Sequence, residues 1–381
     1  MPRILVMGDP QAPFAKLLEV LDQHRALDGD RLAADVVLVS IGDHFDYDLV
    51  DWRTAGQEGL RFLRWLADHD PAQAVLLLGN HDASRVMELI AISDERFAAA
   101  RAFARELDGD PARNARFRAA FPELPSPGLA GRDFASFCVE QRALTMELLL
   151  AGRFHLALAG QLSDGRPVLL THAGVTRREL DLLGVAGAPD PLATRAASTA
   201  GATPAAGATG LAPDVHDLAA RLEAVLAASV AAVRDDWTRG LPTPLSLEPL
   251  HLAGIPGEEG GGLLYHRPSN PHRRGADHSW ELARERPRRF DPRTLPPGLT
   301  QVAGHTGHNK CLDELDGWAA PGAFRRSHGG IRTLRLAGQT VTYDLGIAAP
   351  AAGVADLILI DGEIRRVPAS EVELLPLAAL H

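Results

Sequence analysis

Three short apolar runs, each ended by a glycine and a polar residue, constrain the fold of this 381-residue chain more than any other feature. They are Arg3–Met7, Val36–Ile41 and Ala74–Leu78, followed by Gly8-Asp9, Gly42-Asp43 and Gly79-Asn80. Such runs are typical of strands buried on both faces of a sheet. Between them, Phe14–His24 and Gly59–Asp68 carry apolar residues at helical spacing. This alternation predicts parallel strands joined by helices, which is an α/β fold.

Polar clusters follow these strands at their carboxyl ends, where ligands collect in open α/β sheets. Further along the chain, Phe154–Ala159 and Pro167–Thr171 are predicted to be strands joined by a turn, and Thr300–Ala303 another strand. If the strands lie side by side, five polar clusters converge on one rim. The clusters are Asp9-Pro10-Gln11, the segment from Asp43 to Asp46, the segment from Asn80 to Asp82, His172 and His305.

The side chains of these clusters are mainly oxygen and imidazole donors. Such mixed ligands suit first-row divalent ions such as Mn, Fe, Zn, Ni or Co. A carboxylate can bridge two ions, and Asp43 is the natural candidate; the ion pair would then clamp a phosphoryl group. His81, next to Asn80, is placed to give a proton to the leaving oxygen, and Asp46 is placed to fix its tautomer.

The order of the motifs GD, GDHFD, GNHD, THAG and GHT resembles the calcineurin-like metallophosphoesterase superfamily. THAG and GHT are similar to the forms in its branch of protein Ser/Thr phosphatases and symmetrical diadenosine tetraphosphatases. The resemblance spans Asp9 to His308 and implies a four-layer α/β/β/α sandwich with a dinuclear metal site. By position it implies Asp9 and Gln11 on the first metal, Asp43 as the bridge, Asn80, His172 and His305 on the second metal, and His81 as catalytic acid backed by Asp46.

The chain departs from the superfamily pattern in three places. Gln11 stands where a metal-binding histidine is usual, and an amide oxygen is a weaker, harder ligand that favours Mn or Mg. Manganese is therefore the metal we expect first. Tyr47 replaces the phosphate-binding arginine of the protein phosphatases. His308 lies three residues after His305 rather than two, so it is either an extra ligand or a group that points at substrate.

Two arginines are candidates for binding the substrate phosphate. Arg85 follows the GNHD motif, would face the site on a helix that starts there, and resembles an arginine near this place in protein phosphatases. Arg267 precedes the last predicted ligand in the segment Tyr265-His266-Arg267-Pro268 and would form a second phosphate clamp. An ordinary surface charge is the alternative interpretation of each arginine.

The chain is interpreted as a single domain over residues 1–381 with three irregular or inserted segments. Residues 85–150 are predicted to be a helical insertion or cap. Residues 186–213, rich in Ala, Gly and Pro, are predicted to be a flexible loop. Residues 242–297, rich in Arg and Pro, are either a functional loop or partly disordered.

The charge balance and the absence of apolar spans limit the function classes. Against 49 acidic residues stand 39 lysines and arginines, giving a formal net charge of −10, which disfavours a nucleic-acid binder such as a nuclease. No signal peptide is visible and no run of about 18 apolar residues occurs, so we expect a cytoplasmic protein without membrane contact. We expect a hydrolase of small phosphorylated or nucleotide substrates; a protein Ser/Thr phosphatase and a non-catalytic scaffold are the alternatives, and the oligomeric state stays open.

Overall fold

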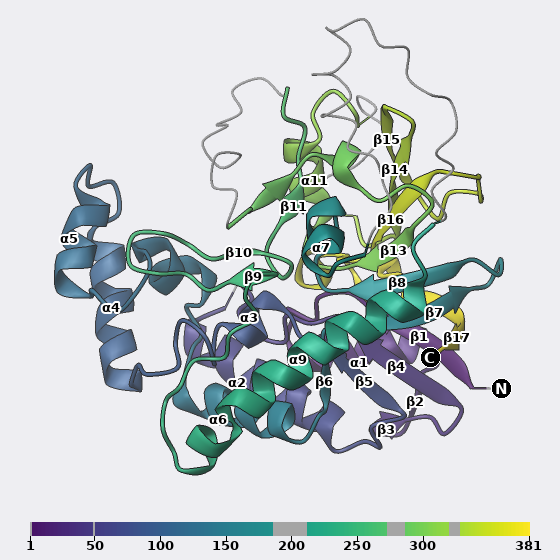
Figure 1. Cartoon of the computed structure of the whole chain (residues 1–381). Helices are drawn as coiled ribbons and strands as arrows, with labels where there is room; N and C mark the ends of the chain where they lie inside the picture. Colours follow the sequence, from purple (N-terminus) through teal and green to yellow (C-terminus); the bar gives the residue numbers. More distant parts are fainter. Residues whose placement is uncertain (1, 49, 186–211, 273–285, 320–327) are drawn as a thin grey trace, which may run out of the picture.

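The computed structural model describes residues 2–48, 50–185, 212–272, 286–319 and 328–381 (Figure 1). Its largest element is an 11-stranded sheet in the order β15-β14-β16-β13-β8-β7-β17-β1-β4-β5-β6. The strands are β1 (Arg3–Met7), β4 (Val36–Ser40), β5 (Ala74–Leu77), β6 (Phe154–His155), β7 (Ala157–Leu162), β8 (Pro167–Thr171), β13 (Thr300–Ala303), β14 (Arg332–Ala337), β15 (Thr340–Leu345), β16 (Ala355–Leu359) and β17 (Leu375–Leu380).

The sheet folds over so that two β layers face each other across one apolar cluster. Alternate side chains of a strand point to opposite faces, so each strand contributes one set of residues to this interface. One layer supplies side chains from β1, β4 and β5, and the other from β8, β13 and β16. Examples from the shared cluster are Val6, Val39, Leu77, Leu170, Val302 and Ile358, all buried.

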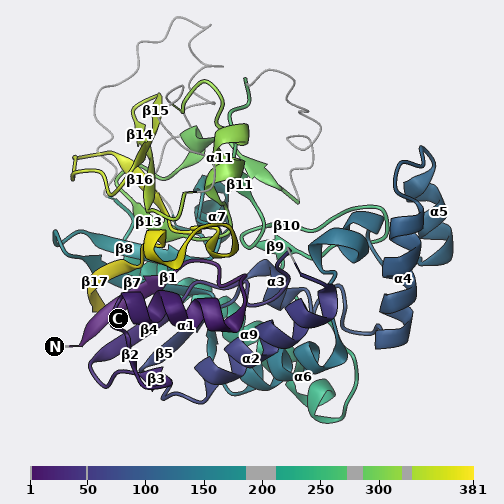
Figure 2. The same ribbon diagram turned by 180° about the vertical axis from the view of Figure 1, so that it is seen from behind.

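Helices cover the outer faces of both β layers, which completes the expected α/β/β/α order. The helices α1 (Phe14–Gln23), α2 (Trp52–Ala67) and α6 (Val139–Leu150) pack with the outward side chains of β1, β4 and β5 and are seen best from behind (Figure 2). On the other side, α9 (Val215–Thr238) crosses β7 and β8 (Figure 1), and α11 (His308–Glu314) packs on β13, β14 and β16.

The predicted single strand Phe154–Ala159 is wrong in one respect, because the chain changes layer within it. Phe154–His155 is β6 and pairs with β5, whereas β7 begins at Ala157 and pairs with β8 and β17. At the crossing, Glu223 of α9 accepts hydrogen bonds from the backbone N–H groups of Leu156 and Ala157 at 2.6 and 3.0 Å. A side chain from a distant helix therefore replaces the sheet partners that the crossing residues lack.

The C-terminal strand β17 was not predicted and holds the two layers together. It runs antiparallel to β1 on one side and to β7 on the other, with a register shift between Leu377 and Ala379. Its inward residues Leu375 and Leu377 belong to the cluster between the layers. The last residues of the chain thus join strands that lie about 150 positions apart in sequence.

The segment after β5 begins with a short helix and then becomes a helical extension. The elements are α3 (Asn80–Ala83), α4 (Asp94–Glu106), α5 (Arg113–Ala120) and the π-helix η1 (Leu129–Asp133). Buried aromatic side chains form a separate cluster here, among them Phe97, Phe117, Phe121, Phe134 and Phe137. Helices α4 and α5 extend away from the sheet in both views (Figures 1 and 2), whereas α6 packs against α2 and α9.

The remaining elements are short. They are β2 (Leu27–Asp28), β3 (Arg31–Leu32), α7 (Arg177–Leu182), β9 (His251–Leu252), β10 (Gly261–Gly262), β11 (Arg267–Pro268), β12 (Arg289–Phe290), η3 (Pro292–Thr294), η4 (Ile364–Arg366) and η5 (Ala369–Glu371). Most of the predicted loop 186–213 lies outside the described residues. No helix in the described part of the chain has the length and apolar character needed to cross a bilayer.

Candidate metal centre

Six polar residues follow the carboxyl ends of the parallel strands of both layers. They come one to three positions after β1, β4, β5, β8, β13 and β16, and all of them are buried. We call this set the metal rim, and its members are Asp9, Asp43, Asn80, His172, His305 and Asp361. The first five were predicted from sequence, and the structure brings them to one edge of the sandwich.

The backbone at the metal rim is held in an unusual conformation. Asp43, Asp46 and His305 have φ values of 59°, 64° and 60°, a region in which non-glycine residues are uncommon and strained. The glycines before His305 and Asn80 are needed for space: a Cβ on Gly304 would lie 2.1 Å from Asp9 Oδ1, and one on Gly79 would lie 2.3 Å from Asp43 Oδ1. Strain of this kind is typical of functional sites.

Asp82, which the sequence did not assign to the metal rim, braces the loop that carries Asp43. Its carboxylate accepts hydrogen bonds from the backbone N–H groups of Asp43, His44 and Gly79 at 2.9, 3.1 and 3.0 Å. It also contacts His44 Nδ1 at 3.0 Å. The GNHD motif therefore supplies a rim residue, Asn80, and a second residue, Asp82, that supports the loop carrying Asp43.

The orientation of His172 leaves one ring nitrogen facing two oxygen acceptors. Its Nδ1 donates to the carbonyl of Ile41 at 2.9 Å, which leaves the lone pair of Nε2 free in the neutral ring. Nε2 lies 3.1 Å from Asn80 Oδ1 and 3.3 Å from Asp43 Oδ1. Burial alone would lower the pKa of His172, but the Asp43 carboxylate raises it to about 9. When no metal ion is bound, a proton on Nε2 has to lie between this nitrogen and the oxygen acceptors.

His305 shows the same arrangement. Its Nε2 donates to the carbonyl of Tyr265 at 2.9 Å, and the buried Nδ1 has no partner among the described residues. Its backbone N–H donates to both carboxylate oxygens of Asp9, at 2.9 and 3.0 Å. Burial and the charges of Arg267, His172 and Lys310 lower the pKa of His305 well below its usual value, so its ring is neutral.

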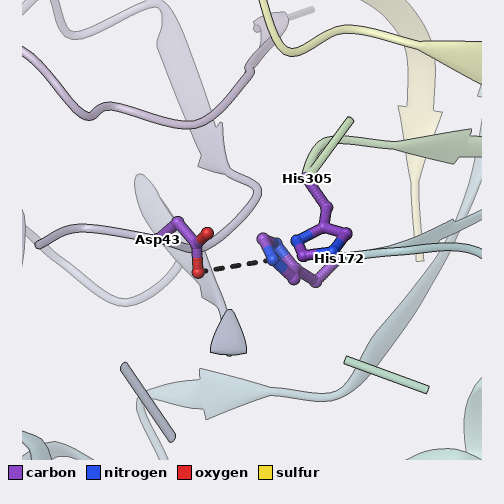
Figure 3. A group of neighbouring side chains, drawn as sticks. All are labelled: Asp43, His172 and His305. Carbon is purple, nitrogen blue, oxygen red and sulfur yellow. Dashed lines mark ion pairs between the residues drawn. The ribbon is translucent and has the colours of Figure 1, made fainter. Parts of the chain in front are cut away.

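The acceptor atoms of three rim residues fit a divalent ion. Ligand atoms of Asp43, His172 and His305 all lie within 4.8 Å of one another. Figure 3 shows the two imidazole rings and the carboxylate side by side, with the Asp43–His172 ion pair dashed. Both histidines use their other nitrogen to bind a backbone carbonyl, an outer contact that commonly orients metal ligands. The residues present therefore suit a metal ion bound by oxygen and imidazole.

Two more carboxylates add negative charge beside this cluster. Burial and the nearby charge of Asp361 raise the pKa of Asp9 well above its usual value. Asp361 was missed in the sequence analysis, although it follows β16 in the sequence Ile360-Asp361-Gly362 and so repeats the strand-then-acid pattern. Closely spaced buried carboxylates repel each other, and a bound cation is the usual compensation.

His81 and Asp46 form the predicted pair next to the metal rim. His81 Nδ1 donates to Asp46 Oδ2 at 2.9 Å, and His81 Nε2 lies 3.8 Å from Asp43 Oδ2. Ser136 fixes the other oxygen of Asp46 through its N–H and hydroxyl, at 2.9 and 2.6 Å. Burial alone would raise the pKa of Asp46, but the Arg85 guanidinium and His81 hold it below the usual value. Asp46 therefore stays ionised behind the imidazole.

The structure does not place Arg85 where it was predicted to bind phosphate. Its side chain is fully buried, and its guanidinium binds Asp46 Oδ2 at 2.6 Å, Gln141 Oε1 at 2.9 Å and the carbonyl of His81 at 2.8 Å. The reason is local: α3 ends at Ala83, so the helix that would have turned Arg85 toward the site does not continue. Arg85 supports Asp46 from behind.

The other predicted residues divide into two groups. Gln11 and Arg267 line a pocket of about 820 Å³ that also contains His81 and Asp46. Gln11 donates from Nε2 to the carbonyl of Phe45 at 3.1 Å, which leaves its amide oxygen available as a ligand. His308 is fully buried and is not among the residues that line this pocket, with Nδ1 2.9 Å from the hydroxyl of Tyr343. Its role as an extra ligand or as a contact with substrate stays a prediction.

Residues 2–182 match the sequence model of the calcineurin-like phosphoesterase family, a range that includes Asp9, Asp43, Asn80 and His172. The fold and the metal rim agree with this match. Residues 2–182, just under half of the chain, therefore belong to the calcineurin-like phosphoesterase family, whose members bind divalent metal ions and hydrolyse phosphoric esters, although some of them are non-catalytic.

Two further comparisons add nothing to this assignment. No curated protein matches the chain. Among solved structures, a mutant of a cold-active protein tyrosine phosphatase is similar with a TM-score of 0.33 and 13% identity, over 99% of this chain and 75% of that chain. A likeness this low carries no inference about substrate.

Proposed function

We propose that this protein hydrolyses a phosphate ester or anhydride in a small phosphorylated or nucleotide substrate, with two divalent metal ions, manganese first among them. The observation that carries the proposal is the orientation of His172 and His305. Each ring binds a backbone carbonyl through one nitrogen and turns the other toward the carboxylate of Asp43 or the buried interior. Such a set of facing acceptors is suited to holding cations.

The metal rim would hold the two ions, with Asp43 between them. Asp9 and Gln11 are the proposed ligands of the first ion, and Asn80, His172 and His305 those of the second. When bound, the ions supply Lewis acidity that polarises the phosphoryl group and makes a water molecule more acidic. The oxygen of a water molecule would bond to phosphorus and release a proton to solvent, while the bond from phosphorus to the leaving oxygen breaks.

The chain itself supplies the proton for the leaving oxygen. His81 lines the pocket, and its Nδ1–H is held by Asp46, so an imidazolium formed there carries its second proton on Nε2. The ionised Asp46 stabilises that imidazolium, and Arg85 and Ser136 keep Asp46 in place. Phe134 stands perpendicular to the His81 ring at 5.1 Å and limits its rotation.

A protein Ser/Thr phosphatase is the second candidate within the same chemistry. The arginine that binds phosphate in those enzymes is replaced by Tyr47, whose side chain is 6% exposed. The pocket beside His81 has a volume suited to a small organic ligand. Both observations favour a small substrate over a phosphorylated protein.

The test is a panel of p-nitrophenyl phosphate, diadenosine tetraphosphate and phosphopeptides, each assayed with added manganese. We expect turnover of the first two and little turnover of phosphopeptides. Turnover of phosphopeptides alone would favour the protein phosphatase. A protein that retains no metal after manganese loading and hydrolyses nothing would favour the scaffold and contradict the proposal.

A further inference from the structure

The pocket beside His81 is surrounded by basic side chains from four separate parts of the chain. They come from η1, from the segment around β11 and β12, from α11 and from η4. We call these side chains the pocket wall, and they are Arg132, Arg267, Arg288, Arg289, Lys310, Arg365 and Arg366. A pocket for a single phosphoryl group on two metal ions does not need so many cations.

Most cations of the pocket wall are matched by a carboxylate. Arg132 pairs with Asp133, Arg288 with Glu259, Arg289 with Glu314, and Arg365 and Arg366 both with Asp48. Arg267 and Lys310 differ, since the side chain of neither forms an ion pair or hydrogen bond with any described residue, and the Nε of Arg267 is buried without a partner. Two positively charged side chains thus face the pocket without a salt bridge to any described residue.

Arg267 and Lys310 line the same pocket, which also contains His81 beside the metal rim. The charge of Arg267 is the largest cause that lowers the pKa of Lys310, to about 8. The charges of both residues also lower the pKa of His305. Arg105, another basic residue at the pocket without an ion pair among the described residues, lies on α4 close to Arg101 instead.

A count of charges indicates that Arg267 and Lys310 are not both needed to neutralise the reacting phosphoryl group. Two divalent ions carry four positive charges. Asp9, Asp43, Asp361 and one phosphoryl dianion together carry one negative charge more than that. Arg267 and Lys310 are therefore not both needed to balance the reacting phosphoryl group. A second phosphate in the substrate would offer them an anionic partner, and cations without a salt bridge bind such a group without first breaking an internal ion pair.

We propose that Lys310, together with Arg267, forms a second anion subsite, so that the preferred substrate carries at least two linked phosphates. This inference rests on the hydrolase function proposed above and names the substrate class for the same site. Lys310 reaches the pocket from α11, only five residues after His305. It is one of only two lysines among the 39 basic residues of the chain, the other being Lys16 of α1.

The first test compares two inhibitors of p-nitrophenyl phosphate hydrolysis by the manganese-loaded protein. Methylphosphonate presents one phosphonate, and methylenediphosphonate presents two that cannot be hydrolysed apart. We expect the second to bind at least about tenfold more tightly, and we expect Lys310→Met to remove most of that advantage, since a charge-assisted hydrogen bond is worth that much. Lys310→Arg should restore the advantage, and Lys16→Met should leave it unchanged.

The second test does not depend on activity. Reductive ¹³C-methylation keeps the lysine charge and labels Lys16, Lys310 and the N-terminus, which gives a very simple spectrum. In the zinc-loaded protein, methylenediphosphonate should shift the Lys310 signal and methylphosphonate should not; Lys310→Arg assigns the signal. If the Lys310 signal does not respond, or if Lys310→Met weakens both inhibitors equally, the second subsite is disproved. If wild-type protein hydrolyses nothing, the proposed function fails, while the signal shift still decides the subsite.

Discussion

The metal rim and the pocket wall both gather charged groups around one space, yet they hold them differently. Rim side chains are buried, and two of them, Asp43 and His305, stand on strained backbone whose N–H groups are held by the carboxylates of Asp82 and Asp9. Wall side chains are long, mostly exposed or half-buried, and come from short or irregular elements. A fixed rim suits ligands that must match the geometry of a metal ion, whereas flexible cations suit anions of variable shape.

The comparison predicts the largest effect at the bridge position of the metal rim. Asp43→Ala should abolish metal retention and lower kcat/KM by about a thousandfold or more, because metal stabilisation of transition-state charge is worth several kcal/mol. Metal content by mass spectrometry and turnover of p-nitrophenyl phosphate measure this. Full metal content in Asp43→Ala would remove Asp43 from the ligand set.

The next largest effect should follow from removing the proton donor without disturbing the metal rim. His81→Ala should lower kcat by about a hundredfold to ten-thousandfold, as is typical for loss of a general acid. Metal content should stay close to wild type, because the proposed ligands are other residues. Unchanged turnover in His81→Ala would contradict the proton-donor assignment.

Substitution of Arg85 tests whether this residue supports Asp46 and His81 or contacts the substrate. Arg85→Met should lower kcat about tenfold through a less well held Asp46 and His81, and leave KM within about twofold. It should also lower the free energy of unfolding by about 3 kcal/mol, because a fully buried ion pair is broken. A rise in KM with unchanged kcat would restore the phosphate contact predicted from sequence. Arg85→Lys, which keeps the charge, should recover part of kcat.

The smallest effect is expected at a matched cation of the pocket wall. Arg288→Met should change KM by less than about threefold, since the charge of Arg288 is already balanced by Glu259 in a partly buried ion pair and is not available to the substrate. Steady-state kinetics with p-nitrophenyl phosphate and diadenosine tetraphosphate measure this. If Arg288→Met weakened substrate binding as much as Lys310→Met, a salt bridge to a carboxylate would not decide which cations of the pocket wall bind the substrate.

Sequence patterns were sufficient for the metal rim because each member has the same local signal. An apolar strand, a glycine or other small residue and then a donor recur at Asp9, Asp43, Asn80, His172 and His305. The same signal at Asp361 was available but was overlooked. Parallel pairing brings strand ends to one edge, so local patterns alone predicted a convergence between residues almost 300 positions apart.

The pocket wall could not be predicted in the same way. Its cations stand on η1, η4, α11 and short strands that have no hydrophobic periodicity, and arginine is common throughout the chain. The orientation of Arg85 and His308 depends on where α3 ends and α11 begins, and helix boundaries are the least certain part of any pattern analysis. Strand β17 depends on pairing with distant strands rather than on its own sequence.

Anomalous X-ray diffraction from crystals of the manganese-loaded protein soaked with phosphate would show whether the metal rim binds two ions. We expect two manganese peaks at the carboxyl ends of the strands, one of them in contact with Asp43, His172 Nε2 and His305 Nδ1, and phosphate beside them facing His81. Manganese bound elsewhere, with His172 and His305 contacting only protein atoms, would contradict this expectation.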